Sequence, residues 1–165
     1  MSSPQTLSEV YEHELQDLWS ANDQMSAVVG RLAQKSSDQM LKARLTTAKA
    51  GIQKHTDLLK TFLKDIDADV SKEHCKGMEG LVKEAEKHAI DAHIKDGAVR
   101  DVVIIAQYQR MCHYGICGFG TVKAFAKALG NEDHVAKLDA ATADIYGADE
   151  NMTDLAERSV NLKAL

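Results

Sequence analysis

The sequence has little proline and few aromatic residues. It contains one proline, Pro4, and three phenylalanines among 165 residues, and aromatic residues make up only 5%. A chain that is poor in proline and rich in Ala, Leu, Lys, Asp and Glu has the composition of long helices rather than of a β-sheet protein. Apolar residues make up 44% of the chain, which is enough to bury one core. The composition predicts one all-α domain over 1–165.

The sequence also lacks an excess of basic residues and any long apolar run. Its formal net charge is -5, so it offers no basic face for nucleic acid or anionic lipid. No stretch is long and apolar enough to span a membrane, and the start MSSPQTLSEV has no basic segment followed by an apolar core. The cysteines, at 75, 112 and 117, are odd in number and form no C-x-x-C pair, so we expect reduced thiols. These absences favour a cytoplasmic protein with no nucleic-acid or membrane partner.

Apolar residues recur at the three- and four-residue spacing of amphipathic helices. The first predicted helix begins at a capping box of Thr6 and Glu9 and ends near 33, and a second capping box, of Ser36 and Gln39, starts a helix that ends at 65. A connector at 67–74 leads to a shorter polar helix over 75–94. Long helices follow over 99–129 and from Asn131 to about 159, with Gly130 in a left-handed turn between them. Residues 1–5 and 160–165 are predicted to be tails.

The lengths of the connections predict how these helices are arranged. Turns of a few residues force neighbouring long helices to lie antiparallel, whereas the longer middle connection with its extra helix lets the chain cross over. This pattern predicts a ferritin-like four-helix bundle with an additional short helix in the crossover connection. Glu14 and Asn22 fall on the apolar stripe of the first helix, which includes Leu7, Tyr11, Leu18, Met25, Val29 and Leu32.

Four ordered patches indicate a family. They are TLSEVYEHELQDLWSAND at 6–23, CKGMEGLVKEAE at 75–86, RDVVIIAQYQRMCHYGICGFGTVKAFAKALG at 100–130 and MTDLA at 152–156. In these patches the chain resembles the YciF/YciE-type family of small bacterial ferritin-like proteins. The resemblance implies a homodimer of ferritin-like bundles, an association with stress responses and usually a pair of metal ions in each bundle.

The chain departs from that family pattern at the expected metal ligands. The family has Glu at the position of Asn22, and E-H-Y-E where this chain reads Cys112-His113-Tyr114-Gly115. A family stretch that resembles H-L-E-E-T corresponds to about 48–52 here, Ala-Lys-Ala-Gly-Ile. The last helix of the family carries Glu-Glu and then Asp, in the region where this chain has Asp144, Ile145 and Asp149. Only part of the acidic ligand set is therefore kept.

Chemistry gives an independent argument against a di-metal centre. Such a site in a helical bundle uses about four carboxylates and two histidines, with a Glu-x-x-His pair on each of two helices. No Glu in this chain is followed three residues later by His, and no acidic residue occurs between Asp38 and Asp57. Two divalent ions would lie in an interior with too little negative charge. We therefore expect no metal and no cofactor. The alternative is a metal-dependent di-iron or di-manganese oxidoreductase that uses Glu14, His55, His113 and Asp149.

The stretch MCHYGICGFG at 111–120 could in principle hold other chemistry. Cys112 and His113 are adjacent, about 100° apart on a helix, so they cannot chelate one inward ion. Cys112 as a nucleophile, with Asp149 or His55 as base, would need a cation or a helix N-terminus to lower its pKa, and a mid-helix position offers neither. We expect His113 to be a hydrogen-bonded histidine at the core edge, and Cys75 and Cys117 to be small buried residues.

Small residues at former carboxylate positions leave two interpretations of the bundle centre. Either Tyr108, Tyr146, Met25 and Ile145 fill it while polar side chains hydrogen-bond one another as a packed layer, or a cavity remains that accepts a small apolar or aromatic ligand. The predicted ligand site comprises Asn22, Gln53, Tyr108, Cys112, Gly115 and Asp149. The sequence thus predicts a degenerate metal site in a stress-associated homodimer that binds a small molecule or acts structurally, and it leaves enzymatic activity open.

Overall fold

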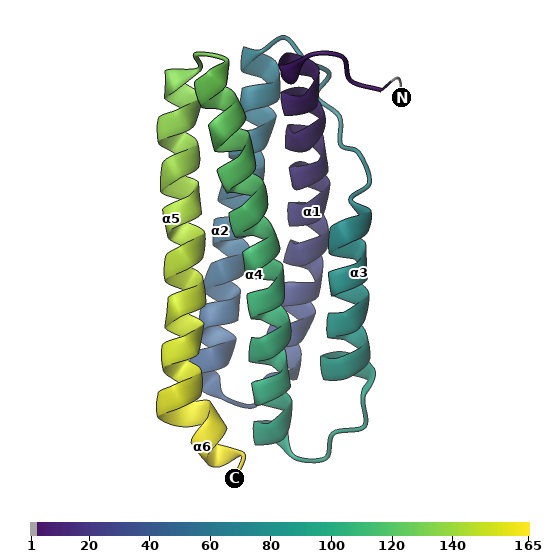
Figure 1. Ribbon diagram of the computed structural model, residues 1–165. Helices are drawn as coiled ribbons and strands as arrows, with labels where there is room; N and C mark the ends of the chain where they lie inside the picture. Colours follow the sequence, from purple (N-terminus) through teal and green to yellow (C-terminus); the bar gives the residue numbers. More distant parts are fainter. Residues whose placement is uncertain (1–2) are drawn as a thin grey trace.

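The computed structural model describes residues 3–165 as a bundle of four long helices with no strand in that range (Figure 1). The long helices are α1 (Leu7–Lys35), α2 (Gln39–Asp65), α4 (Gly97–Ala128) and α5 (Glu132–Leu155). The connection between α2 and α4 contains α3 (Lys76–Ala85) and the π-helical turn η1 (Glu86–Asp91), which lie against α1 and α4. The predicted all-α bundle with a short helix in the crossover is confirmed.

The helix starts follow from local capping. Thr6 and Glu9 form the predicted capping box of α1. The predicted second capping box is wrong: Ser36 is the C-cap of α1, and the Asp38 side chain accepts from the backbone N–H groups of Met40 and Leu41 at the start of α2. Asp38 prevails because an ionised carboxylate is a stronger acceptor for these N–H groups than a hydroxyl.

Two further helix boundaries and the burial of one residue differ from the predictions. The predicted C-terminal tail is largely helical, because α5 continues through a π-helical turn, η2 (Ala156–Val160), into α6 (Asn161–Lys163). The α4 helix begins two residues earlier than expected, since Asp96 caps it by accepting from the N–H groups of Ala98 and Val99. Leu7, placed on the inward stripe, is 38% exposed because it lies in the first turn at the end of the bundle. Gly130 has the predicted positive φ, 77°.

The core consists of two clusters of buried side chains, one toward each end of the bundle. One includes Tyr11, Phe62 and Phe119, and its apolar packing is continuous across all four long helices. The other includes Met25, Tyr108 and Met152 and lies toward the end of the bundle that contains the turn between α1 and α2. Helix α1 packs closely along α2, and α4 along α5, whereas α2 and α5 contact each other much less. The bundle is therefore least tightly closed between α2 and α5.

Candidate ligand pocket

A pocket of about 860 Å³ opens between α2 and α5 and extends inward to α1 and α4. This volume falls in the range of small-molecule sites, about 300–1,000 Å³. The innermost side chains come from Asn22 and Met25 on α1 and from α4. The lining residues are Asn22, Met25, Met40, Ala43, Arg44, Thr47, Ala48, Ala50, Gly51, Ile52, Lys54, His55, Tyr108, Met111, Cys112, Gly115, Ala143, Asp144, Ile145, Gly147, Ala148, Asn151 and Met152.

The helical periodicity of α2 accounts for one wall of the pocket. Its lining residues recur at three- and four-residue steps, as in 44, 47, 48, 51, 52 and 55, and half of these six are small. The opposite wall, from α5, carries Ala143, Gly147 and Ala148 at the same kind of spacing. An added Cβ at Gly51 or Gly147 would meet no atom within 4 Å, so both walls border open space. Small side chains on two facing helices thus leave room for a guest.

Four of the six residues predicted for the ligand site line this pocket, namely Asn22, Tyr108, Cys112 and Gly115. Gln53 does not. Its side chain is exposed and donates to Asp57 Oδ1 at 3.1 Å, because Ile52 and His55 occupy the inward positions of that turn. Asp149 is not a lining residue, although its carboxylate lies close enough to raise the pKa values of Tyr108 and Cys112.

The hydrogen-bonded polar layer that the sequence left open does not form. Asn22 Nδ2 and Asp149 Oδ1 are both buried, and neither has a hydrogen-bond partner within residues 3–165. Tyr146, which was considered as a filler of the centre, is 49% exposed instead. Tyr108, Met25 and Ile145 do turn inward, but they line the pocket rather than close it.

The Cys112 thiol is buried and protonated at neutral pH. Burial, with a smaller contribution from the charge of Asp149, raises the pKa of Cys112 to about 12. Burial also raises the pKa of the neighbouring Tyr108 hydroxyl, and the charge of Asp149 adds to this effect. A thiolate nucleophile is therefore disfavoured at this position, as the mid-helix location indicates.

The charged residues of the pocket lie at its rim. Lys54 and Asp144 are exposed and paired at 3.6 Å, and Arg44 donates to the backbone carbonyl of Asn151. His55 is buried and its Nε2 lies 3.4 Å from Asp144 Oδ2. Burial lowers the pKa of His55, which Asp144 partly offsets. Arg44 and Lys54 were not among the predicted site residues, although their spacing from the small residues of α2 places them on the same face.

The side chains of the alternative metal site are not gathered in one place. His113 Nε2 lies 3.1 Å from Asp149 Oδ2, whereas His55 is paired with Asp144. The pKa of Glu14 is raised, chiefly by burial. Within residues 3–165, no group of three or more His, Cys, Asp or Glu side chains is arranged to hold a metal ion. This donor set does not fit a di-metal centre, so we derive no chemistry through one.

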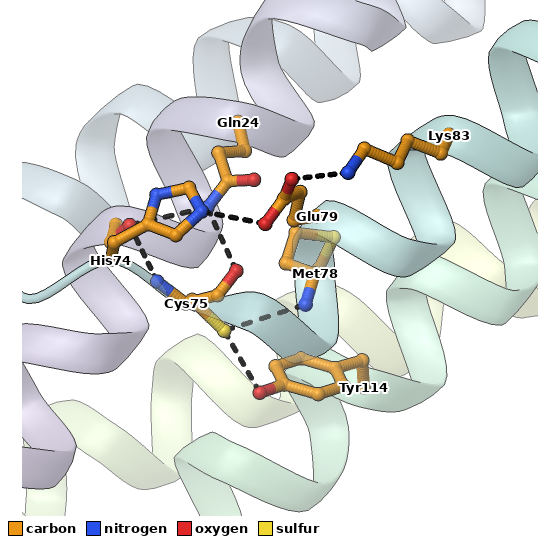
Figure 2. Close-up of polar contacts among 8 residues, drawn as sticks. Gln24, His74, Cys75, Met78, Glu79, Lys83 and Tyr114 are labelled. Atoms are coloured by element: carbon orange, nitrogen blue, oxygen red, sulfur yellow. Dashed lines mark hydrogen bonds and ion pairs between the residues drawn. The ribbon is translucent and has the colours of Figure 1, made fainter.

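The remaining predicted residues take different places. His113 is hydrogen-bonded as expected but is largely exposed. Cys117 is exposed rather than buried, which corrects that prediction, because it lies on the outer face of α4. Cys75 is fully buried at the N-cap of α3, where its Sγ lies 3.0 Å from the Tyr114 hydroxyl (Figure 2).

Fold and pocket together define a helical-bundle protein of two tightly packed helix pairs with a central pocket between them. Residues 6–165 match the model of the family described as domain of unknown function DUF892, and the chain belongs to that family. None of the helices in residues 3–165 is both long and apolar enough to cross a membrane.

The relatives that match this chain cover nearly all of it. Protein YciF of Escherichia coli strain K12 is 29% identical over 163 residues, which is 96% of this chain and 95% of YciF. The crystal structure of YciF, described as a stress protein, superposes with a TM-score of 0.89 at 26% identity and covers 96% of this chain and 99% of that one. YcfI of Rhodopseudomonas palustris, provisionally described as a structural protein, has a TM-score of 0.85 at 28% identity, with 90% and 94% covered. The family resemblance seen in the sequence is confirmed.

Proposed function

We propose that this protein is a stress-associated helical-bundle protein that binds a small apolar or aromatic molecule in the pocket between α2 and α5, without a functional di-metal centre. The observation that carries the proposal is the pocket itself, about 860 Å³ in volume and lined mainly by apolar and small side chains. Few polar groups face it, as in many sites that bind apolar guests. The stress association comes from the similarity to YciF.

The lack of metal chemistry is supported by the charges around the pocket. Its lining contains a single carboxylate, that of Asp144, together with the cations Arg44 and Lys54. Two divalent ions need several carboxylates to balance their charge in an interior of low dielectric constant. Metal analysis of protein purified without chelators tests this part. We expect well under one iron or manganese per chain, and a near-stoichiometric content would overturn it.

Filling the pocket tests the binding part. An added Cβ at Gly115 would lie 3.6 Å from Ile145 Cδ1, an ordinary contact, so a larger side chain there extends into open volume. We expect Gly115→Leu to raise the melting temperature above that of Gly115→Ala, because it buries apolar surface in a void. The same pair at Gly120, where an added Cβ meets nothing, separates pocket filling from helix propensity.

A fluorescent apolar dye gives the second readout. Wild type should bind it, and Gly115→Leu should weaken that binding without loss of helicity. If Gly115→Leu instead destabilises the protein by about 1–3 kcal/mol, as overpacking does, and no small molecule shifts the melt, the structural function is favoured. The description of the similar protein YcfI suggests this structural function as a second candidate.

We also propose that the protein acts in the cytoplasm as a homodimer. The family resemblance supports the dimer, and the three cysteines without a C-x-x-C pair, which fit reduced thiols, support the location. Analytical ultracentrifugation at micromolar concentration tests the dimer, because a single species at the mass of one 18.1 kDa chain would contradict it.

A further inference from the structure

The inner end of the pocket is lined by a side chain whose buried hydrogen-bond donor has no partner in the part of the chain that the structure describes. Asn22 is 7% exposed, lines the pocket and has a buried Nδ2 with no acceptor in residues 3–165. An amide N–H group buried without a partner costs free energy, and native proteins seldom retain one. The terminal torsion of an asparagine side chain is broad, so its NH2 group can turn toward a guest. A guest that offers an acceptor at this point would satisfy the donor.

Electrostatics at the inner end favours a neutral acceptor. The cations Arg44 and Lys54 lie at the rim, where each is engaged with Asn151 or Asp144. Among residues 3–165, no cationic side chain lines the inner part beside Asn22, and the charge of Asp149 acts on the adjacent Tyr108 and Cys112. A carboxylate or phosphate placed there would face this negative charge in a medium of low dielectric constant. A carbonyl oxygen would accept from Asn22 without that penalty.

The shape and lining indicate the body of the guest. Met25, Met111 and Met152 are buried around the inner end, and methionine side chains adapt to aromatic and irregular apolar surfaces. The α2 wall runs from Met40 to His55, which is roughly 20 Å of helix at about 1.5 Å per residue. The pocket therefore accommodates a ring system or an extended apolar molecule.

From these observations we infer that the pocket binds a neutral apolar carbonyl compound, such as an aryl ketone or a quinone, whose oxygen accepts a hydrogen bond from Asn22. This inference rests on the proposed function and specifies the chemical class of the ligand. The Asn22 side-chain amide and the apolar wall would recognise the ligand, and binding involves no covalent step.

A matched pair of probes tests it. Benzophenone and diphenylmethane have the same two rings, but only benzophenone carries a carbonyl oxygen. We expect wild type to bind benzophenone about three- to tenfold more tightly by calorimetry or by the shift of the melting temperature, the advantage of one additional hydrogen bond. Asn22→Leu should remove this preference while diphenylmethane binding remains. Asn161→Leu, at an exposed asparagine outside the pocket, should keep it.

Benzophenone also reports where it binds. Under near-ultraviolet light its excited carbonyl removes a hydrogen atom from a nearby C–H group, and the two radicals join in a new C–C bond. Mass spectrometry should find the adduct on Met25, Met111 or Met152. Labelling confined to residues outside the pocket would overturn the assignment, even if the folding of Asn22→Leu were impaired.

The outcomes separate the two levels of the proposal. If both probes bind wild type equally, the pocket function stands and the carbonyl inference fails. If neither probe binds, and the pocket is instead covered by a second copy or filled on its own, the proposed function fails as well. Only a preference for benzophenone that depends on Asn22 supports both.

Discussion

At the scale of single residues, the three cysteines have three different environments. Cys75 and Cys112 are buried, and burial raises the pKa of both thiols, that of Cys112 to about 12. Cys117 is exposed on α4. Alkylation requires a thiolate and access to the sulfur. We expect iodoacetamide at pH 7.5 to modify Cys117 alone in the native protein, as measured by intact-mass and peptide mass spectrometry.

Two controls make this prediction precise. Cys117→Ser should remain unmodified in its native state over the same time, and all cysteines should react once the chain is unfolded in guanidinium. An adduct on native Cys112 as fast as on Cys117 would contradict its burial and its raised pKa, and would reopen the nucleophile interpretation that the sequence allowed.

The sequence predicted single residues well where helical spacing alone decides their position. Asn22, Tyr108, Cys112 and Gly115 all reach the pocket because they fall on the inward stripes of α1 and α4. Gln53 was misplaced because polar residues that border a stripe can turn either way, and an interaction with Asp57 one turn later holds it outside. Cys117 was misplaced because small apolar residues are tolerated on an outer helix face.

At the scale of elements, hydrogen bonds hold the N-terminal end of α3 against α1. The Cys75 backbone N–H donates to Ser20 Oγ at 3.0 Å. Gln24 donates to the Cys75 carbonyl oxygen at 3.0 Å (Figure 2). The Tyr114 hydroxyl approaches from α4 so closely that an added Cβ at Gly77 would lie 2.7 Å from it. Gly77 therefore permits the contact between α3 and α4.

Two glycines on α3 give a matched test of this contact. An added Cβ at Gly80 meets nothing within 4 Å, so Gly80→Ala should stabilise the protein by about 0.5–1 kcal/mol through helix propensity. Gly77→Ala gains the same propensity but must displace the Tyr114 ring from Cys75, so we expect a net loss of about 1 kcal/mol. Urea unfolding of both variants measures the difference, and equal stabilisation would show that the contact is dispensable.

Hydrogen bonds to one carboxylate on α4 hold the turn between α1 and α2 against that helix. The Asp101 carboxylate is almost fully buried and accepts from Ser37 N at 2.9 Å, Ser37 Oγ at 2.5 Å and Asp38 N at 2.8 Å. These donors come from the last residues before α2, so one side chain satisfies backbone groups that the turn leaves open. Asp101 thereby fixes where α2 begins.

We expect Asp101→Asn to destabilise the protein by about 2–3 kcal/mol, because the amide replaces an acceptor oxygen with a donor that faces other donors. Ser37→Ala, which removes only the hydroxyl contact, should cost about 1 kcal/mol. Chemical denaturation checks both values. A loss at Asp101 no larger than that at Ser37 would mean that the two backbone contacts contribute nothing.

Helices and turns could be predicted where the residues that define them lie close together in the sequence. The capping box at Thr6, the turn at Gly130 and the crossover helix all follow from residues within a few positions of one another. The role of Asp101 could not, because its partners lie more than 60 positions away along the chain. The continuation of α5 as far as Lys163 was missed for a similar reason: Lys163 is held by Asp38, a partner 125 positions away.

At the scale of the whole molecule, the pocket results from how the helix pairs are joined. Helices α1 and α2 form one tightly packed pair, and α4 and α5 form the other, whereas small residues face each other across α2 and α5. Helices α1 and α2 each show an amphipathic pattern in their own sequence. Only the relative position of the two pairs decides whether those small residues meet closely or leave a pocket, and this relation is absent from any local stretch of sequence.

His55 connects this pocket to the stability of the whole bundle. It is buried at the rim beside Asp144 and Lys54, and burial lowers its pKa below the ordinary value of 6.5. Above about pH 6.5 the imidazole is neutral in both the folded and unfolded states, so it does not lower the folding stability. As the pH falls below that value, the unfolded chain binds the proton first, and folding stability decreases until the lowered folded pKa is passed.

We expect the melting temperature of wild type to fall between pH 7.5 and 5.5 by more than that of His55→Gln, in which this proton linkage is removed. Differential scanning calorimetry of the two proteins at matched ionic strength measures the difference, since protonation of their other groups is shared. Parallel curves would show that His55 is protonated equally well in the folded bundle, and hence that the pocket rim is open to water. A difference that grows when an apolar ligand fills the pocket would instead place the imidazole in contact with the bound molecule, because further burial lowers the pKa of His55 further.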